Sequence, residues 1–474
     1  MSAIEYVSTR GGVQPASFGE VLLDGAASDG GLVVPTTLPV IDEERLREWR
    51  ALDYADLATA VIAPFAADIP SDELAAMTHR AYAPEAFDDE RIVPVTALDG
   101  GIGLVGLSEG PTWAFKDLAM RFLGEAIPYR LAATDRTLTV LGATSGDTGS
   151  AAEHAFLGAH GVRVVMLSPQ GRMSPVQRAQ MFSIDDPAIR NLAVEGVFDD
   201  CQDLVKTISA DTAFATAHSI GAVNSINVAR IIAQTVFYVW AWLRATEEVD
   251  GRAADERISF VVPSGNFGNV YAGHLARRMG VPIHRLVVAT NENDVLDEFF
   301  RTGVYAPRTR EHTHATSSPS MDISKASNLE RFVWDLLGPE RFVERWPELA
   351  REGRLDLRDE LPRLREEFGF VSGSSDHAHR LDAIRDVYRT HGIVIDPHTA
   401  DGVSVARTFT EPGERLLVLE TAKAVKFPET VAEALGDDAP PVSDAVRALL
   451  ALPQRVVDVP GDVDAIRAVI EELD

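Results

Sequence analysis

The chain has 474 residues, 46% of them hydrophobic and 24% charged, a composition typical of a globular protein with two or three domains. Its 44 basic and 72 acidic residues give a net charge of −28, which argues against nucleic acid and membranes as partners. A single cysteine, Cys201, excludes a disulfide framework, and because neither a signal-peptide pattern nor a membrane-spanning apolar run is present we expect a cytoplasmic protein.

Helical patterns dominate the first 90 residues, and from Arg91 short β-branched runs alternate with helical stretches. This alternation is typical of parallel sheets built from βαβ units, so we predict an α/β fold. Strands are predicted at 137–141, 162–167, 258–262, 286–289, 393–395 and 416–419. The predicted domains are 1–90, an N-terminal helical domain; 91–225, a lysine-bearing region with a small α/β domain; 226–304 with 391–474, a large α/β domain; and 305–390, an irregular insertion.

A lysine follows an aromatic residue within 110–121, at the point where a helix is predicted to begin. Apolar neighbours and a helix N-terminus disfavour an ammonium group and make a neutral amine or a Schiff base easier to hold. Lys116 is therefore the first candidate for a reactive residue. The alternative is an ordinary surface lysine at the start of an amphipathic helix.

Two loops that each follow a predicted strand and open a helix are candidates for anion binding. The loop 142–149 offers backbone N–H groups and three hydroxyls, and it lacks the lysine of a Walker A loop. In the loop 263–269, Gly265 and Gly268 allow the backbone to approach a phosphate closely. The alternatives are an N-cap turn for the first loop and a simple glycine turn for the second.

A third glycine cluster, 101–106, matches the dinucleotide fingerprint but is not preceded by a predicted strand, so it is interpreted as a short strand or hairpin. The histidine pairs His312 with His314 and His377 with His379 would share a side if they lay on strands. Because no third ligand completes either pair, we interpret them as solvated loop residues and predict no metal site.

A reactive lysine, a hydroxyl-rich anion loop and a separate phosphate loop together call for an aldehyde cofactor that carries its own phosphate, which is pyridoxal 5'-phosphate. The chain resembles the threonine synthases of the longer bacterial and fungal type, in the fold-type II group of pyridoxal-phosphate enzymes, which is tryptophan synthase β-like. The resemblance covers nearly the whole chain and rests on the motifs at 6–11, 29–35, 110–117, 143–149, 224–230, 264–268, 321–331 and 421–427.

The resemblance implies two sheet-containing domains with helices on both faces and an N-terminal helical preface. It implies that Lys116 anchors the cofactor and shuttles protons, that Phe115 packs beside the cofactor and that the Thr421 hydroxyl meets the pyridine nitrogen. The residues implied to cradle the cofactor phosphate are Ser264, Gly265, Asn266, Phe267 and Gly268. Many related enzymes have asparagine at the position of Asp147, beside the cofactor, so this carboxylate is expected to be protonated, to point elsewhere or to contact Lys116.

The implied reaction converts O-phospho-L-homoserine and water to L-threonine and phosphate. The residues implied to hold the substrate carboxylate are Ser145, Gly146 and Thr148, and those implied to hold its phosphate are Asn224, Arg230, Thr144 and Lys426. Glu109 and Trp113 depart from the family pattern and are expected to reshape the mouth of the pocket. Two other readings stay open, another fold-type II lyase or dehydratase and a non-catalytic phosphate-binding protein. The substrate is a small molecule, and the choice between a monomer and a homodimer is open.

Overall fold

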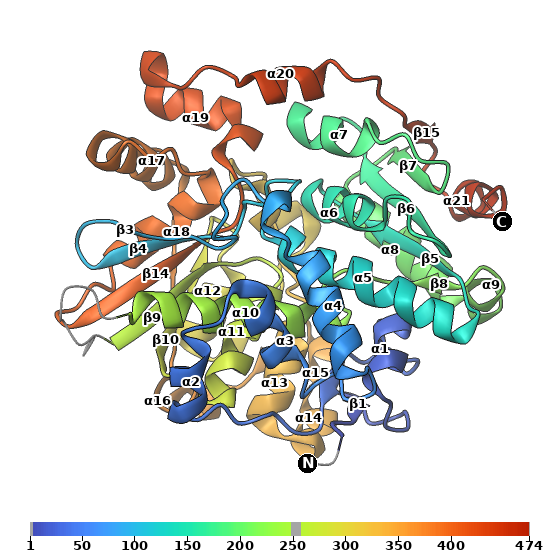
Figure 1. Cartoon of the computed structure of the whole chain (residues 1–474), viewed down its shortest axis with the longest axis horizontal. Coiled ribbons are helices and arrows are strands. Elements are labelled where there is room, and N and C mark those ends of the chain that lie inside the picture. Colours follow the sequence, from blue (N-terminus) through green and yellow to red (C-terminus); the bar gives the residue numbers. More distant parts are fainter. Residues whose placement is uncertain (1–2, 248–256, 474) are drawn as a thin grey trace.

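Two open sheets organise the chain in this computed structural model, which describes residues 3–247 and 257–473 (Figure 1). The six-stranded sheet has the order β13-β10-β9-β14-β4-β3, and only β3 runs antiparallel to its neighbour. The five-stranded sheet is parallel throughout, in the order β15-β7-β6-β5-β8. Helices cover the faces of both sheets, which confirms the predicted fold class.

The six-stranded sheet is built from buried runs rich in valine, isoleucine and leucine, because both of its faces are covered. Its strands are β3 (Val95–Ala97), β4 (Ile102–Gly106), β9 (Arg257–Pro263), β10 (Ile283–Thr290), β13 (Phe370–Ser374) and β14 (Glu414–Glu420). The glycine cluster at 101–106 forms one arm of the β3–β4 hairpin, as predicted. Since β4, β9 and β14 are parallel, the segments that follow them emerge at the same edge of the sheet.

The five-stranded sheet and its helices form the second α/β layer. Its strands are β5 (Leu138–Ala143), β6 (Val162–Pro169), β7 (Ile189–Val194), β8 (Ile220–Gly221) and β15 (Val457–Val459). The helices of this stretch are α5 (Lys116–Thr134), α6 (Asp147–Phe156), α7 (Pro175–Phe182), α8 (Phe198–Ala210) and α9 (Thr212–Ala217). The C-terminal strand β15 is an edge strand of this sheet, and the helix that follows it lies at the far right of Figure 1.

Helix α10 (Val228–Ala245) lies at the centre of the main core. Sixteen of its eighteen residues are buried, because it packs against helices of both the N-terminal part and the sheet layers. The N-terminal elements are β1 (Tyr6–Ser8), α1 (Phe18–Asp24), β2 (Val33–Pro35), α2 (Glu43–Trp49), α3 (Tyr54–Ile62), α4 (Ser71–Ala81) and the turn η1 (Pro84–Ala86). The N-terminal region is thus mainly helical and shares one core with the rest of the chain.

The remaining elements lie between and after the strands of the six-stranded sheet. Before β13 these are α11 (Gly268–Met279), α12 (Val295–Thr302), β11 (Val304–Tyr305), η2 (Arg310–His312), η3 (Pro319–Met321), α13 (Leu329–Leu337), α14 (Pro339–Arg345), α15 (Glu348–Glu352), β12 (Leu355–Asp356), η4 (Arg358–Glu360) and α16 (Leu361–Glu366). After β13 they are α17 (His377–His391), α18 (Pro397–Arg407), η5 (Ala424–Lys426), α19 (Pro428–Leu435), η6 (Gly436–Asp438), α20 (Asp444–Leu450) and α21 (Val463–Glu471).

The strand predicted at 393–395 is wrong. Only Ile395 forms an isolated bridge, to Lys423, and the run leads into α18, where Asp396 caps the helix and Pro397 is its first residue. The apolar run is nevertheless buried at Ile395, which explains its strand-like composition. The predicted domain ranges stay a prediction, although β13 of the six-stranded sheet falls within 305–390 and β15 of the five-stranded sheet falls within 391–474.

Candidate active site

Lys116 is the first residue of α5, at the edge of the six-stranded sheet where β14 ends. The backbone N–H of Phe115 donates to the carbonyl of Thr421 at 3.0 Å, and Ala114 forms a bridge with Ala422. The lysine side chain is only 13% exposed, and its Nζ lies 4.9 Å from the centre of the Phe115 ring. The fold therefore brings Phe115, Lys116 and Thr421 together, as the sequence motifs predict.

The Asp147 carboxylate joins two lysines that are distant in sequence. Its Oδ2 lies 3.1 Å from Lys116 Nζ and its Oδ1 lies 2.7 Å from Lys426 Nζ. Gln177 Nε2 donates to Oδ1 at 3.0 Å, and Ser320 Oγ donates to Oδ2 at 3.2 Å. Of the three expectations for Asp147, contact with Lys116 is the one that the structure contains.

Burial and charge set the protonation states of this group. Burial alone would raise the pKa of Asp147, but the charges of Lys116 and Lys426 hold that pKa well below its usual value. Burial lowers the pKa of Lys116, Asp147 restores part of it, and the positive charges of Lys426 and Arg230 lower it further. Asp147 is therefore ionised, and Lys116 loses its proton more readily than an ordinary lysine does.

The loop 144–148 presents free hydroxyl groups at the start of α6. Thr144 Oγ1 accepts from the backbone N–H groups of Gly146 and Gly149, each at 2.9 Å, so this hydroxyl holds the loop itself. Gly146 has φ of +132°, and a Cβ there would lie 2.7 Å from the Gln177 side chain. Among the described residues the hydroxyls of Ser145 and Thr148 have no protein partner, so they are available to an anion.

The loop 264–268 forms a tightly packed turn at the start of α11. Ser264 is 4% exposed, and its Oγ is buried with no partner in the described part of the chain. A Cβ at Gly265 would lie 3.1 Å from Met321 Cα, and one at Gly268 would lie 3.2 Å from Ser225 Cβ. A free hydroxyl and close-packed glycines before a helix N-terminus fit the phosphate of pyridoxal phosphate.

Asn266 and Phe267 shape this loop with their side chains. Asn266 Nδ2 donates to Ser225 Oγ at 3.1 Å, and Asn266 Oδ1 accepts from the backbone and hydroxyl of Ser327 at 2.8 and 2.7 Å. Phe267 has a left-handed backbone with φ of +64°, and its ring packs 5.6 Å from that of Phe300 in the core. Both side chains are thus engaged by protein, and Phe267 offers a ligand only its main chain.

Arg230 is a buried cation for which the described residues supply no counter-ion. It is 3% exposed, and among the described residues its Nε and Nη1 atoms have no hydrogen-bond partner. Burial lowers the pKa of Arg230 to about 10. The nearby Asn224 accepts a hydrogen bond from the backbone N–H of Ile226 at 2.9 Å. A buried guanidinium with unpaired N–H groups, near enough to Lys116 to lower its pKa, suits a bound anion.

Lys426, predicted to help hold the substrate phosphate, is committed to protein groups. Besides Asp147, its Nζ donates to the carbonyl of Thr112 at 2.8 Å, and the side chain is fully buried. The two residues that depart from the family pattern, Glu109 and Trp113, are found in the same region. Glu109 forms an ion pair with Lys423. Trp113 has a left-handed backbone with φ of +55°.

Sequence reasoning missed three residues that support Asp147. Gln177 and Ser320 contact its carboxylate, and His398 Nε2 accepts from the Ser320 backbone N–H at 3.1 Å while its Nδ1 lies 2.7 Å from Asp396. The Ser-Pro-Val-Gln pattern at 174–177 indicates a capping box, and this capping box forms. Because the pattern already accounts for Gln177, it gives no sign of the second contact of this residue, with Asp147. No local pattern signals the roles of Ser320 and His398.

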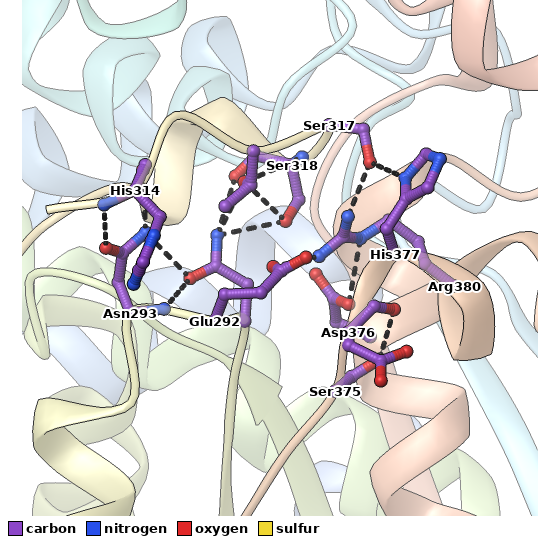
Figure 2. Close-up of polar contacts among 12 residues, drawn as sticks. Glu292, Asn293, His314, Ser317, Ser318, Ser375, Asp376, His377 and Arg380 are labelled. Atoms are coloured by element: carbon purple, nitrogen blue, oxygen red, sulfur yellow. Dashed lines mark hydrogen bonds and ion pairs between the residues drawn. The ribbon is translucent and has the colours of Figure 1, made fainter.

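The two histidine pairs take part in protein contacts. Figure 2 shows His314, whose backbone N–H donates to Asn293 at 2.8 Å, and His377, whose Nδ1 lies 2.8 Å from Ser317 Oγ. His377 and His379 lie on α17 rather than on a strand. Within 3–247 and 257–473 no cluster of three potential metal ligands occurs. In the same ranges no helix is long and apolar enough to span a bilayer.

Comparison with known proteins identifies the family. Three family models match: "Threonine synthase N terminus" over 5–82, "Pyridoxal-phosphate dependent enzyme" over 107–422 and "Threonine synthase, C-terminal" over 399–470. Threonine synthase from Corynebacterium glutamicum is 51% identical over 98% of both chains, and that from Methylobacillus glycogenes is 48% identical over 99% of this chain and 100% of the relative. The crystal structure of pyridoxal-phosphate-bound threonine synthase from Brucella melitensis superimposes with a TM-score of 0.91 at 36% identity, covering 99% of both chains. The chain belongs to the threonine synthase family of pyridoxal-phosphate-dependent enzymes.

Proposed function

We propose that this enzyme is a carbon-oxygen lyase that converts O-phospho-L-homoserine and water to L-threonine and phosphate. The observation that carries the proposal is Arg230, a buried guanidinium whose Nε and Nη1 have no partner among the described residues. The Ser264 loop is proposed to hold the cofactor phosphate, so Arg230 would mark a second anion position, for a substrate phosphate. A fold-type II dehydratase acting on threonine itself would need no such residue.

The residues proposed to hold the cofactor are Lys116, Phe115, Thr421 and the loop 264–268. Lys116 would hold its aldehyde carbon, Thr421 its pyridine nitrogen, and the loop 264–268 its phosphate, while Phe115 would pack beside it. When bound, pyridoxal phosphate supplies an electron-withdrawing ring that stabilises the charge left when protons are removed from substrate carbons. A threonine at the pyridine nitrogen does not enforce ring protonation as a carboxylate would, so control of the protons falls to Lys116.

Lys116 is proposed to move protons at the Cα and Cβ atoms of the substrate. Its lowered pKa keeps a larger share of the amine unprotonated near neutral pH, as a base requires. The ionised Asp147 can stabilise Lys116 each time it carries a proton. Ser145, Gly146 and Thr148 are proposed to bind the substrate carboxylate at the start of α6. That would orient the Cα–H bond for Lys116.

Arg230 is proposed to stabilise the phosphate that leaves Cγ, with Asn224 as a neutral donor. In a buried site, loss of such a charge partner costs about 100- to 1000-fold in kcat. Thr144 would act indirectly by holding the loop 144–148. Lys426 is also proposed to act indirectly. Because its ammonium already contacts the Asp147 carboxylate, we propose that its main role is to hold Asp147 and that contact with the substrate phosphate is secondary.

The test compares two activities of the enzyme reconstituted with pyridoxal phosphate. Phosphate release from O-phospho-L-homoserine and ammonia release from threonine are measured for the unmodified chain, Lys116→Ala and Arg230→Gln. We expect phosphate release to dominate, to vanish in Lys116→Ala, and to fall about 100-fold or more in Arg230→Gln. The exposed Arg389 supplies a matched control, Arg389→Gln, which should keep phosphate release near the unmodified rate. Dominant ammonia release, or full activity without Lys116, would overturn the proposal.

A further inference from the structure

A cavity of about 520 Å³ lies outside the site around Lys116. It is lined by β3 and the segment 90–93 before it, by the first halves of β4 and β14, by the start of α3 and the end of α4, and by the C-terminal end of α10. Arg415, which lines it near the start of β14, is about 20 Å along the strand from Thr421 at the usual rise per residue. None of the residues proposed to bind cofactor or substrate lines this cavity, which we call the α10 cavity.

Two tyrosines of the α10 cavity differ in whether their hydroxyl group has a hydrogen-bond partner. Tyr82 donates to the carbonyl of Leu118 at 2.8 Å, and Trp240 Nε1 in the same wall donates to the carbonyl of Val93 at 2.8 Å. Tyr54 packs against both rings, with centroids 5.0 Å and 5.4 Å away. Yet the Tyr54 hydroxyl, in a residue only 2% exposed, has no partner in the described part of the chain. Such a buried hydroxyl is one that a ligand can satisfy.

Arg244 presents a second unsatisfied donor at the same cavity. Its guanidinium lies 4.6 Å from the centre of the Trp240 ring, and its Nη2 donates to the carbonyl of Arg50 at 2.7 Å. Nη1 pairs with Glu247 at 2.5 Å, whereas Nε is buried with no partner among the described residues. An Nε donor without a protein partner indicates that a ligand in this cavity would carry an acceptor oxygen.

The arginines of the lining are engaged by protein, so an occupant would be recognised by the two donors that have no partner among the described residues, Tyr54 Oη and Arg244 Nε. Arg91 pairs with Asp89 at 2.6 Å, Arg244 pairs with Glu247, and Arg415 Nη1 donates to the carbonyl of Ala245 at 2.9 Å. The acidic lining residues are Asp53, which caps α3; Glu247, which pairs with Arg244; and Glu90, which is exposed. Most of the remaining wall is aromatic or aliphatic, from Tyr82, Trp240 and Leu417 among others.

We propose that the α10 cavity binds a small carboxylate with an apolar or aromatic body. The carboxylate accepts from Arg244 Nε and from the Tyr54 hydroxyl, and the body packs against the aromatic wall. The volume lies in the range of small-molecule sites, and a mostly apolar and aromatic wall with a small number of polar groups is typical of them. This inference concerns a site apart from the reaction and does not depend on the proposed function.

The two tyrosines provide a matched pair of variants. Hydrocinnamate is titrated into the full chain, reconstituted with pyridoxal phosphate, by calorimetry and ligand-observed NMR, with the neutral alcohol of the same skeleton as comparison. We expect hydrocinnamate to bind at least about tenfold more tightly than the alcohol, since the carboxylate accepts charge-assisted hydrogen bonds. Tyr54→Phe should weaken its binding about tenfold without lowering the Tm of the free protein, because the lost hydroxyl had no partner. Tyr82→Phe should lower the Tm and leave binding within about twofold.

A third and a fourth variant locate the anion. Arg244→Lys keeps the charge but removes the Nε donor and should weaken binding of hydrocinnamate about tenfold. Arg230→Gln should leave that binding unchanged. The inference is overturned if hydrocinnamate does not bind, if the alcohol binds equally well, or if Tyr54→Phe and Tyr82→Phe weaken it to the same extent. It is also overturned if Arg230→Gln abolishes binding, since that would place the ligand at the catalytic centre.

Discussion

Asp147 decides the electrostatics of the active site. One carboxylate meets two lysines, a glutamine amide and a serine hydroxyl, so all of its strong acceptor positions are used. Breaking a buried pair by removing one partner is costly, because the other charge is left without compensation. Lys116 is the partner proposed to move protons, and Asp147 raises the pKa that burial and the neighbouring cations lower.

Asp147→Asn should therefore lower the pKa of Lys116 further. Asparagine removes the only opposite charge that raises this pKa, while burial, Lys426 and Arg230 continue to lower it. The rate at which the cofactor-free enzyme captures pyridoxal phosphate, followed by visible absorbance, rises with pH as Lys116 loses its proton. We expect the midpoint of this rise to move to lower pH in Asp147→Asn. Ser320→Ala removes a neutral contact to the same carboxylate and should hardly move it; a midpoint unchanged in both variants would contradict the assignment.

Helix α10 connects the candidate active site with the α10 cavity. Arg230 lies in its first turn, and Trp240 and Arg244, which line the α10 cavity, lie in its last turns. Its start is set by Asn227, a fully buried N-cap residue whose Oδ1 accepts from the backbone N–H of Ala229 at 3.0 Å. Asn227 Nδ2 also donates to the carbonyl of Leu22 at 2.9 Å, which ties α10 to α1.

Asn227→Ala should destabilise the protein by about 1–3 kcal/mol, because the cap and a buried hydrogen bond are lost together. The free energy of unfolding from urea titration of the cofactor-free enzyme measures this cost. Asn227→Asp is the matched control: it keeps the capping oxygen but cannot donate to Leu22, so it separates the two contributions. Equal stability of Asn227→Ala and the unmodified chain would show that Asn227 does not anchor α10.

The whole molecule carries a net charge of −28 and buries carboxyl groups near the active site. Burial raises the pKa of Glu420 to about 7, assisted by the negative charges of Asp396 and Glu109 and opposed by Lys423. Burial likewise raises the pKa of Asp401 to about 6. As pH rises from about 4, these groups ionise first in the unfolded chain. Stability is therefore lost with rising pH until each folded-state pKa is passed.

Glu420→Gln should flatten the loss of stability between about pH 5 and pH 7. The amide cannot ionise, so the variant avoids a penalty on the order of 1–3 kcal/mol that the carboxyl accumulates over this range. Tm values of the cofactor-free enzyme over this pH range test the effect. Glu366→Gln removes the same formal charge from an exposed position and should retain the slope of the unmodified chain. Parallel curves for Glu420→Gln and the unmodified chain would contradict the raised pKa of Glu420.

Local signals predicted much of the fold and the candidate site. Lys116 at a helix start, the 144–148 loop and the 264–268 loop each follow short-range rules of turns, caps and helix N-termini, and each forms where expected. The strand predicted at 393–395 is wrong because the same buried apolar composition serves a loop that enters a capped helix. Phe267 shows the same limit of prediction from local sequence. Its backbone is part of the 264–268 loop, whereas its ring packs in the core.

The sequence by itself determined the fold class, the family and the segments that meet at the active site. Their chemistry is encoded in short stretches whose conformation depends on near neighbours. Only the tertiary structure decided which groups touch. Asp147 follows a strand of the five-stranded sheet, whereas Lys426 follows one of the six-stranded sheet, so their ion pair exists only because the tertiary fold brings the segments after these two strands together. Among the described residues Arg230 Nε and Nη1 and Tyr54 Oη have no partner, and this too is a tertiary property, because partners come from segments distant in sequence.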